Sequence, residues 1–177
     1  HYDAIRKDDD FIGNVLKGLK ESGLAGNTIV VYFGDHGANN LVRHKQMPTE
    51  GGLHVPFIMA GPAPYVPASA VRDDLVNLLD LSATTLAWAG VPRPDWYEGQ
   101  NLFDSKLVPR SSVFGAKDRL DQTIDRVRTV RTHRYRYTRN FKTDRIFLQP
   151  QYRDTKDYVR NLRAMYADGT LPAKLSE

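Results

Sequence analysis

The sequence predicts an α/β fold that continues into a small α+β piece, and two observations predict it. Short apolar, β-branched runs alternate with helical patterns over the first 91 residues, which is typical of strands covered by helices. After residue 110, short segments of alternating character follow one another with turn residues between them, which is typical of antiparallel strands. We therefore expect an α/β domain over residues 1–105 and a small subdomain with antiparallel strands and a helix, itself incomplete, over residues 106–177.

The first expected element is an amphipathic helix over residues 3–22, followed by Gly23 as its terminator. Residues 27–34 and 54–62 are then short runs that are apolar on both faces. That pattern is typical of strands in a parallel sheet whose two faces are covered by helices. The apolar residues that share one side of the helix are Ile5, Ile12, Val15, Leu16 and Leu19.

A second helix is expected within residues 73–91, with Asp80 or Ser82 as its cap and Gly90 at its end. Residues 91–110 are rich in proline and polar residues and are expected to be a linker. The remaining elements are three short strands and a helix with Tyr158, Leu162 and Met165 on one stripe; they cover residues 111–117, 125–132, 134–140 and 154–167, with a turn near Thr132-His133 between the last two strands.

Composition limits the chemistry that this chain can perform alone. Its 177 residues include no cysteine, which excludes a disulfide, a zinc–thiolate site and a thiol nucleophile within them. No stretch approaches the roughly 18–20 apolar residues of a membrane helix, so we expect no membrane partner. The net charge of +4 indicates acidic partners without naming them.

Asp35 and His36 follow directly after the first apolar run. Ligands of open α/β sheets bind beyond the carboxyl ends of the strands, where this pair is expected to lie. A carboxylate oxygen and an imidazole nitrogen together form a credible half-site for a metal ion, and the ammonium group of Lys45 could hold a tetrahedral anion. The alternative is that Asp35 caps a turn and His36 is an ordinary loop histidine.

Two stretches, "NTIVVYFGDHG" and "HKQMPTEGGLHVPFIMAGP", resemble the sulfatase family of the alkaline-phosphatase superfamily. The family has a strand ending in Ser-Asp-(Asn/His)-Gly, then a Lys, a Glu-Gly-Gly-like turn and a Val-Pro strand. Lys45 precedes Glu50 by five residues, as in the family pattern. The block from residue 114 to 141 is similar to the C-terminal part of sulfatases close to N-sulfoglucosamine sulfohydrolase. The resemblance implies the C-terminal part of an alkaline-phosphatase-like sandwich, in which residues 1–105 belong to the catalytic domain.

The resemblance also implies roles for individual residues. Asp35 and His36 would be two ligands of an active-site divalent cation, and Lys45 would contact the sulfate oxygens and offset charge in the transition state. His44 would either reach the leaving group or hold the loop in place. Arg119, within "KDRLD", would lie on a substrate-facing loop together with Asp121. Glu50 would shape the turn rather than catalyse.

The identity of the cation stays open between two interpretations. The resemblance implies calcium, whereas the imidazole of His36 suits zinc or manganese better. Phosphohydrolases of the same superfamily also have Asp-His-Gly and bind two zinc ions. A zinc-dependent phosphodiesterase or phosphomonoesterase is therefore the alternative enzyme.

Sulfatases use a formylglycine nucleophile made from Cys or Ser in a Cys/Ser-x-Pro-x-Arg motif, and this motif is absent from the chain. The aspartates that the family contributes from an N-terminal strand are absent as well. We therefore expect an inactive fragment whose partner is the missing N-terminal part of the same enzyme, acting on sulfate esters or sulfamates of small molecules or sugars. The family further implies a periplasmic, secreted or lysosomal location, with the signal segment outside this chain. The oligomeric state is not predicted.

Residues 119–145 contain nine Arg or Lys and three Asp. Guanidinium groups recognise sulfate and carboxylate by paired hydrogen bonds, so one interpretation is a contact surface for an anionic sugar chain. The other is a half-buried sheet whose tyrosines, Tyr135 and Tyr137, pack inward while its basic face meets solvent. Nucleic-acid binding is not expected, because no recognised module is present. The non-enzymatic alternative is a catalytically inactive protein that binds polyanions.

Overall fold

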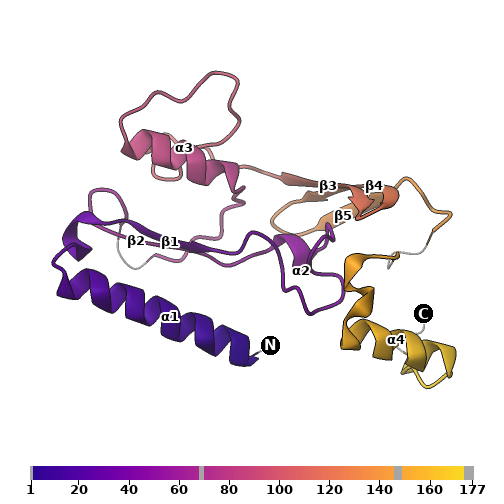
Figure 1. Cartoon of the computed structure of the whole chain (residues 1–177). Coiled ribbons are helices and arrows are strands. Elements are labelled where there is room, and N and C mark those ends of the chain that lie inside the picture. Colours follow the sequence, from indigo (N-terminus) through magenta and orange to yellow (C-terminus); the bar gives the residue numbers. More distant parts are fainter. Residues whose placement is uncertain (1, 68–69, 146–148, 174–177) are drawn as a thin grey trace. The chain divides into compact units, whose positions relative to one another are not determined.

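The computed structural model describes residues 2–67, 70–145 and 149–173 (Figure 1). The chain divides into two compact units. The first unit is built from residues 1–35, 55–114 and 130–136. The second is built from residues 36–54, 115–129 and 137–177. Each unit therefore combines segments that are far apart in the sequence.

Helix α1 (Tyr2–Glu21) opens the first unit and confirms the amphipathic pattern. Gly23 adopts a φ of 74°, a left-handed conformation that glycine adopts without steric cost. Its N–H donates to the carbonyl oxygen of Lys20, and the N–H of Leu24 donates to that of Leu19. These two hydrogen bonds form a Schellman motif, so Gly23 terminates the helix as the sequence predicted. A short 3₁₀ helix, η1 (Ala25–Asn27), leads into the first strand.

Strands β1 (Val30–Phe33) and β2 (Phe57–Ala60) pair with each other in antiparallel register, Val30 opposite Ala60 and Phe33 opposite Phe57. The N–H of Gly34 extends this ladder by donating to the carbonyl oxygen of Pro56 at 3.1 Å. Both strands were predicted, but the parallel direction was wrong for this pair. A run that is apolar on both faces indicates that both faces are covered, and it contains no information about the direction of the neighbouring strand.

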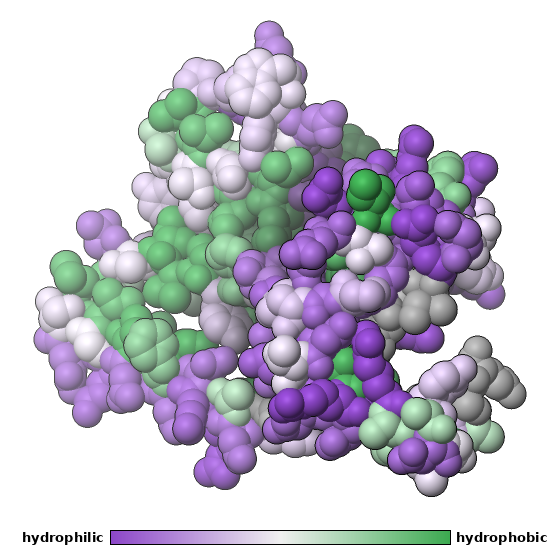
Figure 2. All heavy atoms as spheres, turned by 45° about the vertical axis from the view of Figure 1, so that its right-hand side comes forward, coloured by the Kyte–Doolittle hydropathy of each residue, from purple (hydrophilic) through white to green (hydrophobic). Residues whose placement is uncertain are grey.

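The first unit leaves much apolar surface uncovered, and Figure 2 shows hydrophobic side chains gathered in a broad green region. No described residue of α1 is buried, and the exposed fraction of Phe11 is 69%. Tyr32, Phe33 and Ile58 of the β1–β2 pair are exposed as well. Isolated exposed apolar residues are ordinary, whereas gathered ones are typical of surfaces that contact other protein, a ligand or a membrane.

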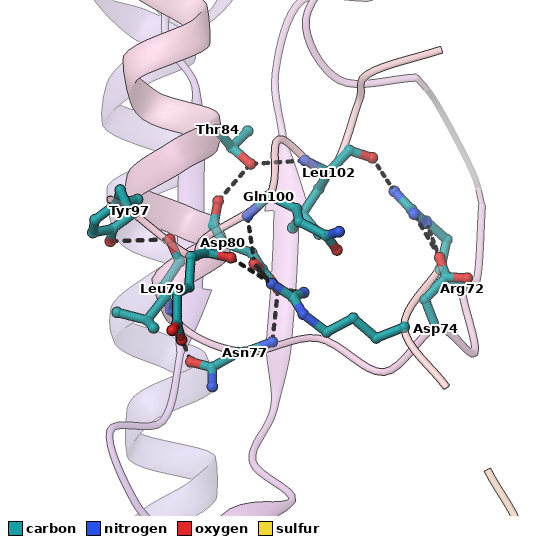
Figure 3. Close-up of polar contacts among 11 residues, drawn as sticks. Arg72, Asp74, Asn77, Leu79, Asp80, Thr84, Tyr97, Gln100 and Leu102 are labelled. Carbon is teal, nitrogen blue, oxygen red and sulfur yellow. Dashed lines mark hydrogen bonds and ion pairs between the residues drawn. The ribbon is translucent and has the colours of Figure 1, made fainter. Parts of the chain in front are cut away.

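Helix α3 (Leu79–Trp88) is held by the buried carboxylate of Asp80, which is 0% exposed. Its oxygens accept from the N–H groups of Asn77 at 2.8 Å and Gln100 at 2.7 Å (Figure 3). Both oxygens also accept from the guanidinium of Arg110, at 2.6 and 2.7 Å. The prediction that Asp80 or Ser82 caps the helix was wrong, because the helix begins at Leu79 with Asp80 in its first turn. Asp80 instead joins the helix to residues 98–110.

The three-stranded sheet lies mostly in the second unit, in the order β3 (Val113–Leu120), β4 (Thr123–Arg131) and β5 (Arg136–Asn140). Leu120 and Val127 are buried. The tight turns between the strands make them antiparallel, as predicted. The inward packing of the tyrosines was wrong, because Tyr135 and Tyr137 are each 64% exposed. The inner positions of β4 are taken by Asp125, Val127 and Thr129.

The described part of the second unit also contains three helical elements. They are α2 (Glu50–Leu53), the 3₁₀ helix η2 (Tyr152–Thr155) and α4 (Asp157–Ala167). The expected helix over residues 154–167 is confirmed from Asp157 to Ala167, whereas residues 154–155 belong to η2 and Lys156 between the two is extended. Across the described part of the chain, no helix combines the length and the apolar character that crossing a bilayer requires.

A buried ion pair lies on the inner face of the sheet, where Lys117 Nζ is 2.6 Å from Asp125 Oδ2. Burial raises the pKa of the Asp125 carboxyl. The hydrogen bond from Lys117, that from the N–H of Arg126 and the charges of Lys117 and Arg145 lower it, and together they prevail. The pKa of Asp125 therefore lies below its ordinary value in the folded protein.

This lowered pKa predicts an acid-sensitive sheet. Because Asp125 binds its proton more weakly when folded, its contribution to stability is fully present above the ordinary carboxyl pKa of about 3.9. We expect that contribution to be lost as the pH falls through the lower, folded pKa. Urea midpoints followed by circular dichroism from pH 7 to pH 2 should therefore fall less steeply with acid for Asp125→Asn than for the unmodified protein. Asp157→Asn, at an exposed pair on α4, is the control, and equal slopes for all three proteins would contradict the assignment.

Candidate functional site

The candidate residues His36, His44 and Lys45 lie together in the sequence on residues 36–54 of the second unit. Asp35 is exposed and is the last residue of this segment of the first unit, two positions beyond the end of β1. Asp35 thus lies beyond the carboxyl end of a strand, as predicted. The assignment of Asp35 and His36 as metal ligands remains a prediction.

Glycines allow residues 36–54 to fold closely on themselves. The N–H of Gly37 donates to the carbonyl oxygen of Gly52 at 3.0 Å, and a Cβ on Gly37 would collide with the carbonyl oxygen of Gly51. A Cβ on Gly52 would collide with that of Met47. Gly37 of Asp-His-Gly and Gly52, the last glycine of Glu-Gly-Gly, are therefore needed because main chain packs directly against main chain at both positions.

The ring of His44 packs against Gly51, where an added Cβ would come within 2.7 Å of Nε2. His44 Nδ1 is 2.8 Å from the carbonyl oxygen of Val42, and His36 Nδ1 is 2.8 Å from that of Gly37. A carbonyl oxygen only accepts, so Nδ1 is the protonated nitrogen of both rings in these contacts. The neutral ring then has its lone pair on Nε2, which is the form that binds a metal or accepts a proton.

The backbone on both sides of His44 and Lys45 is strained. Arg43 and Gln46 have φ values of 63° and 67°, in the left-handed region that costs a non-glycine residue about 1 kcal/mol or more. Thr49 compensates in part, because its hydroxyl donates to the carbonyl oxygen of Arg43 and accepts from the N–H of Gly52. Thr49 is also the N-cap of α2, and Glu50 pairs with His54 on that helix at 3.1 Å. The expected role of Glu50 in shaping the turn remains a prediction.

Residues 150–158 hold the other side of this segment. Arg153, which is 1% exposed, donates to the carbonyl oxygens of Asn39 at 3.2 Å and Lys45 at 3.0 Å. The Nζ of Lys45 lies 5.6 Å from the ring centroid of Tyr152, a cation–π distance. Sequence analysis missed both residues. A basic residue next to a tyrosine gives no local signal that it contacts a segment more than 100 positions earlier.

Arg119 and Asp121 differ from what the sequence predicted. Arg119 is exposed but lies in strand β3, not in a loop. Asp121, at the β3–β4 turn, accepts from Gln46 Nε2 at 2.6 Å and from the N–H of Tyr152. The carboxylate of Asp121 therefore joins the Lys45 segment to η2. A substrate contact by Arg119 stays a prediction.

A divalent cation would find two donors of different kinds at this position, the exposed carboxylate of Asp35 and the imidazole of His36. A carboxylate oxygen and an imidazole nitrogen are both of the kinds that bind divalent cations. Over residues 2–67, 70–145 and 149–173, no three side chains of His, Asp or Glu come together as a cation site would need. The donor chemistry is consistent with the predicted half-site, which needs further ligands.

A pocket of about 500 Å³ lies in the first unit, beside α3. Its polar lining combines Arg93 and Lys106 with Glu98 and Asp104. None of the candidate residues lines it, so this pocket does not coincide with the predicted chemistry.

Comparisons with known proteins bear on this site. A family model described as Sulfatase matches residues 1–91. An ulvan-active sulfatase of Formosa agariphila is 31% identical over 172 residues, which are 96% of this chain and 28% of the relative. An extracellular sulfatase SULF-1 homolog of Drosophila melanogaster is 36% identical over 114 residues, 62% of this chain and 10% of the relative. The chain thus spans less than a third of the length of either relative.

Among solved structures, the chain is similar to BT4656 in complex with its substrate D-glucosamine-2-N,6-O-disulfate. The TM-score is 0.53 at 17% identity, and the match covers 92% of this chain and 37% of the other. At this identity the likeness concerns the fold alone, and it confirms the expected α/β fold class.

Proposed function

Because this chain belongs to the sulfatase family, we propose that it is part of an enzyme that hydrolyses sulfate esters or sulfamates of sulfated sugars. The observation that most supports this is the 31% identity with an ulvan-active sulfatase over 96% of the chain. Residues 1–105 would be the C-terminal part of the catalytic domain, and residues 106–177 would be a small subdomain. The nucleophile, a formylglycine, would lie outside these 177 residues, which have no cysteine.

Lys45 would contact the sulfate oxygens with its ammonium group and offset the charge that grows as the sulfur–oxygen or sulfur–nitrogen bond breaks. Asp35 and His36 would hold one side of a divalent cation, which when bound would supply positive charge beside the reacting sulfate. Sulfatases generally bind such a cation. We propose calcium for it, with zinc or manganese as the alternatives that the imidazole of His36 favours.

His44 is proposed to hold the loop rather than to protonate the leaving group. Its ring packs against Gly51 and its Nδ1 contacts the carbonyl oxygen of Val42, so both contacts are made within the loop. Arg119 is the further candidate for a substrate contact, since its side chain is exposed at the end of β3.

The rest of the enzyme is proposed to cover the apolar surface of the first unit. The exposed side of α1, including Ile5, Phe11 and Val15, lies uncovered in the described chain, as do residues of β1 and β2. Burial of apolar side chains stabilises by about 25 cal/mol per Å². The relatives also extend well beyond the matched region. An extracellular, periplasmic or lysosomal location is proposed by analogy with the extracellular relative.

The test is to assay the full-length protein that contains this chain for release of sulfate from glucosamine 6-O-sulfate and N-sulfate, with metal analysis of the same sample. Sulfate release with one bound calcium supports the proposal. Two zinc ions with turnover of phosphate esters would establish the alternative enzyme. Salt-sensitive binding of sulfated polysaccharide without any turnover would instead indicate a polyanion-binding protein.

Replacing Asp35 by alanine tests the metal assignment in the same full-length protein. We expect loss of the cation, because the remaining imidazole of His36 cannot replace an anionic oxygen ligand, and a parallel loss of sulfate release. Metal content by mass spectrometry and the turnover rate measure both. Asp73→Ala, at an exposed aspartate, is the control. Unchanged metal content and activity in the Asp35 variant would remove Asp35 from the ligand set.

A further inference from the structure

The segment that presents Lys45 is held from a distance by η2. Arg153, the second residue of η2, is almost fully buried. Its Nη1 donates to the carbonyl oxygen of Asn39, its Nη2 to that of Lys45, and its Nε to Gln151 Oε1 at 2.8 Å. Within the described residues no carboxylate forms an ion pair with this guanidinium. A buried charge is costly unless its hydrogen bonds are made, and here main-chain oxygens of the Lys45 segment make them.

The guanidinium is itself oriented before it reaches the segment. Gln151 and Asp154 form a capping box around the start of η2, in which Asp154 Oδ2 accepts from the N–H of Gln151 at 3.2 Å. The same Gln151 presents its Oε1 to Arg153. The planar fork of an arginine loses little further freedom when it is fixed in this way. Arg153 is thus a rigid donor pair aimed at two carbonyl oxygens.

The segment needs such support. Arg43 and Gln46 both have left-handed backbones, and strain of this kind persists only where the surroundings over-determine it. Three more contacts bear on it, two from residues 152–158 and one from the β3–β4 turn. Tyr158 Oη donates to the carbonyl oxygen of Asn39 at 3.2 Å, Tyr152 Oη contacts Asn39 Oδ1 at 3.3 Å, and Gln46 reaches Asp121. Arg153 and these contacts therefore hold the segment by hydrogen bonds at Asn39, Lys45 and Gln46.

We propose that Arg153 is a positioning residue of the enzyme: it fixes the main chain of Lys45 so that the ammonium group, beside the Tyr152 ring, meets the sulfate. The inference rests on the proposed role of Lys45. It adds that the position of the Lys45 ammonium group depends on Arg153 of η2, 108 residues later. A catalytic group displaced by about 1 Å can lose about 10²-fold in rate. A purely structural arginine would change stability without acting through Lys45.

The experiment uses the full-length protein and compares Arg153→Gln and Arg153→Lys with Arg160→Gln, an exposed arginine of α4 that pairs only with Asp157 among the described residues. We expect Arg153→Gln to lower kcat about 10²-fold, with a smaller change in KM. Arg153→Lys, which can reach one carbonyl oxygen instead of two, should lie between. Hydrogen exchange of residues 37–49 should accelerate in the same order, while exchange in β3 and β4 stays as in the unmodified protein. Arg160→Gln should change none of these.

The double variant Lys45→Ala with Arg153→Gln separates positioning from general stability. If Arg153 acts through Lys45, its replacement lowers kcat no further once the ammonium group is gone. An additional loss as large as in the single variant would overturn the proposal, as would unchanged exchange of residues 37–49 in both Arg153 variants. If Arg153→Gln does not fold, Arg153→Lys and its double variant with Lys45→Ala decide in the same way. If the unmodified protein releases no sulfate, the proposed function fails, and the exchange measurement still tests whether Arg153 holds the segment.

Discussion

Lys45→Ala in the full-length protein is expected to lower kcat for a sulfated sugar about 10²–10³-fold, the loss seen when one group that stabilises a developing negative charge is removed. The Nζ of Lys45 is held beside the Tyr152 ring at 5.6 Å, and its main chain is held by Arg153. The ammonium group therefore has a defined place before substrate arrives, which is the condition for electrostatic stabilisation. Initial rates of sulfate release over a range of substrate concentrations measure both kcat and KM.

The control is Lys156→Ala, which removes an exposed lysine just before α4. Lys156→Ala and Lys45→Ala have the same net charge. A general effect of charge on the attraction of substrate therefore appears in both variants. A Lys45→Arg variant should recover part of the rate, since the charge remains but its geometry changes. Retained rate and affinity in Lys45→Ala would remove the assigned role.

Asp80→Ala is expected to lower the free energy of unfolding of the first unit by about 3 kcal/mol. The carboxylate accepts from Asn77, Gln100 and both terminal nitrogens of Arg110. Alanine would leave these donors without their acceptor, which is the costly way to break a buried pair. The magnitude is at the lower end for such pairs because the side chain of Arg110 is 21% exposed and water can reach it.

Urea unfolding followed by tryptophan fluorescence measures this effect, because Trp88 and Trp96 both belong to the first unit. Trp88 lies at the end of α3 and stacks on Phe103, so its emission reports on the joint that Asp80 makes. Asp73→Ala, at an exposed aspartate, provides the comparison and should shift the midpoint little. Equal midpoints for the two variants would show that the network around Asp80 does not stabilise the unit.

Local features of the fold were predictable because local chemistry decides them. Helix α1 and its end at Gly23 follow from apolar spacing and from the left-handed conformation that glycine tolerates. The three strands of the second unit follow from alternation and turn residues. The cap of α3 was not predictable in the same way. An aspartate near a helix start can accept from residues just before the helix or from a distant segment, and Asp80 accepts from both Asn77 and Gln100.

The predicted inward packing of Tyr135 and Tyr137 was wrong for a different reason. Alternation in residues 134–140 predicted that Tyr135 and Tyr137 share one face, and both are exposed, but alternation does not say which face meets solvent. The alternate positions Asp125, Val127 and Thr129 of β4 are buried, and Asp125 pairs with Lys117, so the inner side was already occupied. The apolar side of a strand is recognised only when its neighbours are known.

The sequence by itself determined the chemical groups of the candidate site and their order, since Asp35, His36 and Lys45 follow a strand and the glycines needed for a tight loop lie among them. The tertiary structure alone decided what supports them. It paired β1 with β2 in antiparallel register and brought Arg153 to the carbonyl oxygens of Asn39 and Lys45. The reason is physical: side-chain chemistry is a property of one residue, whereas a main-chain carbonyl is the same in every residue and gives a sequence no sign of the distant donor that will bind it.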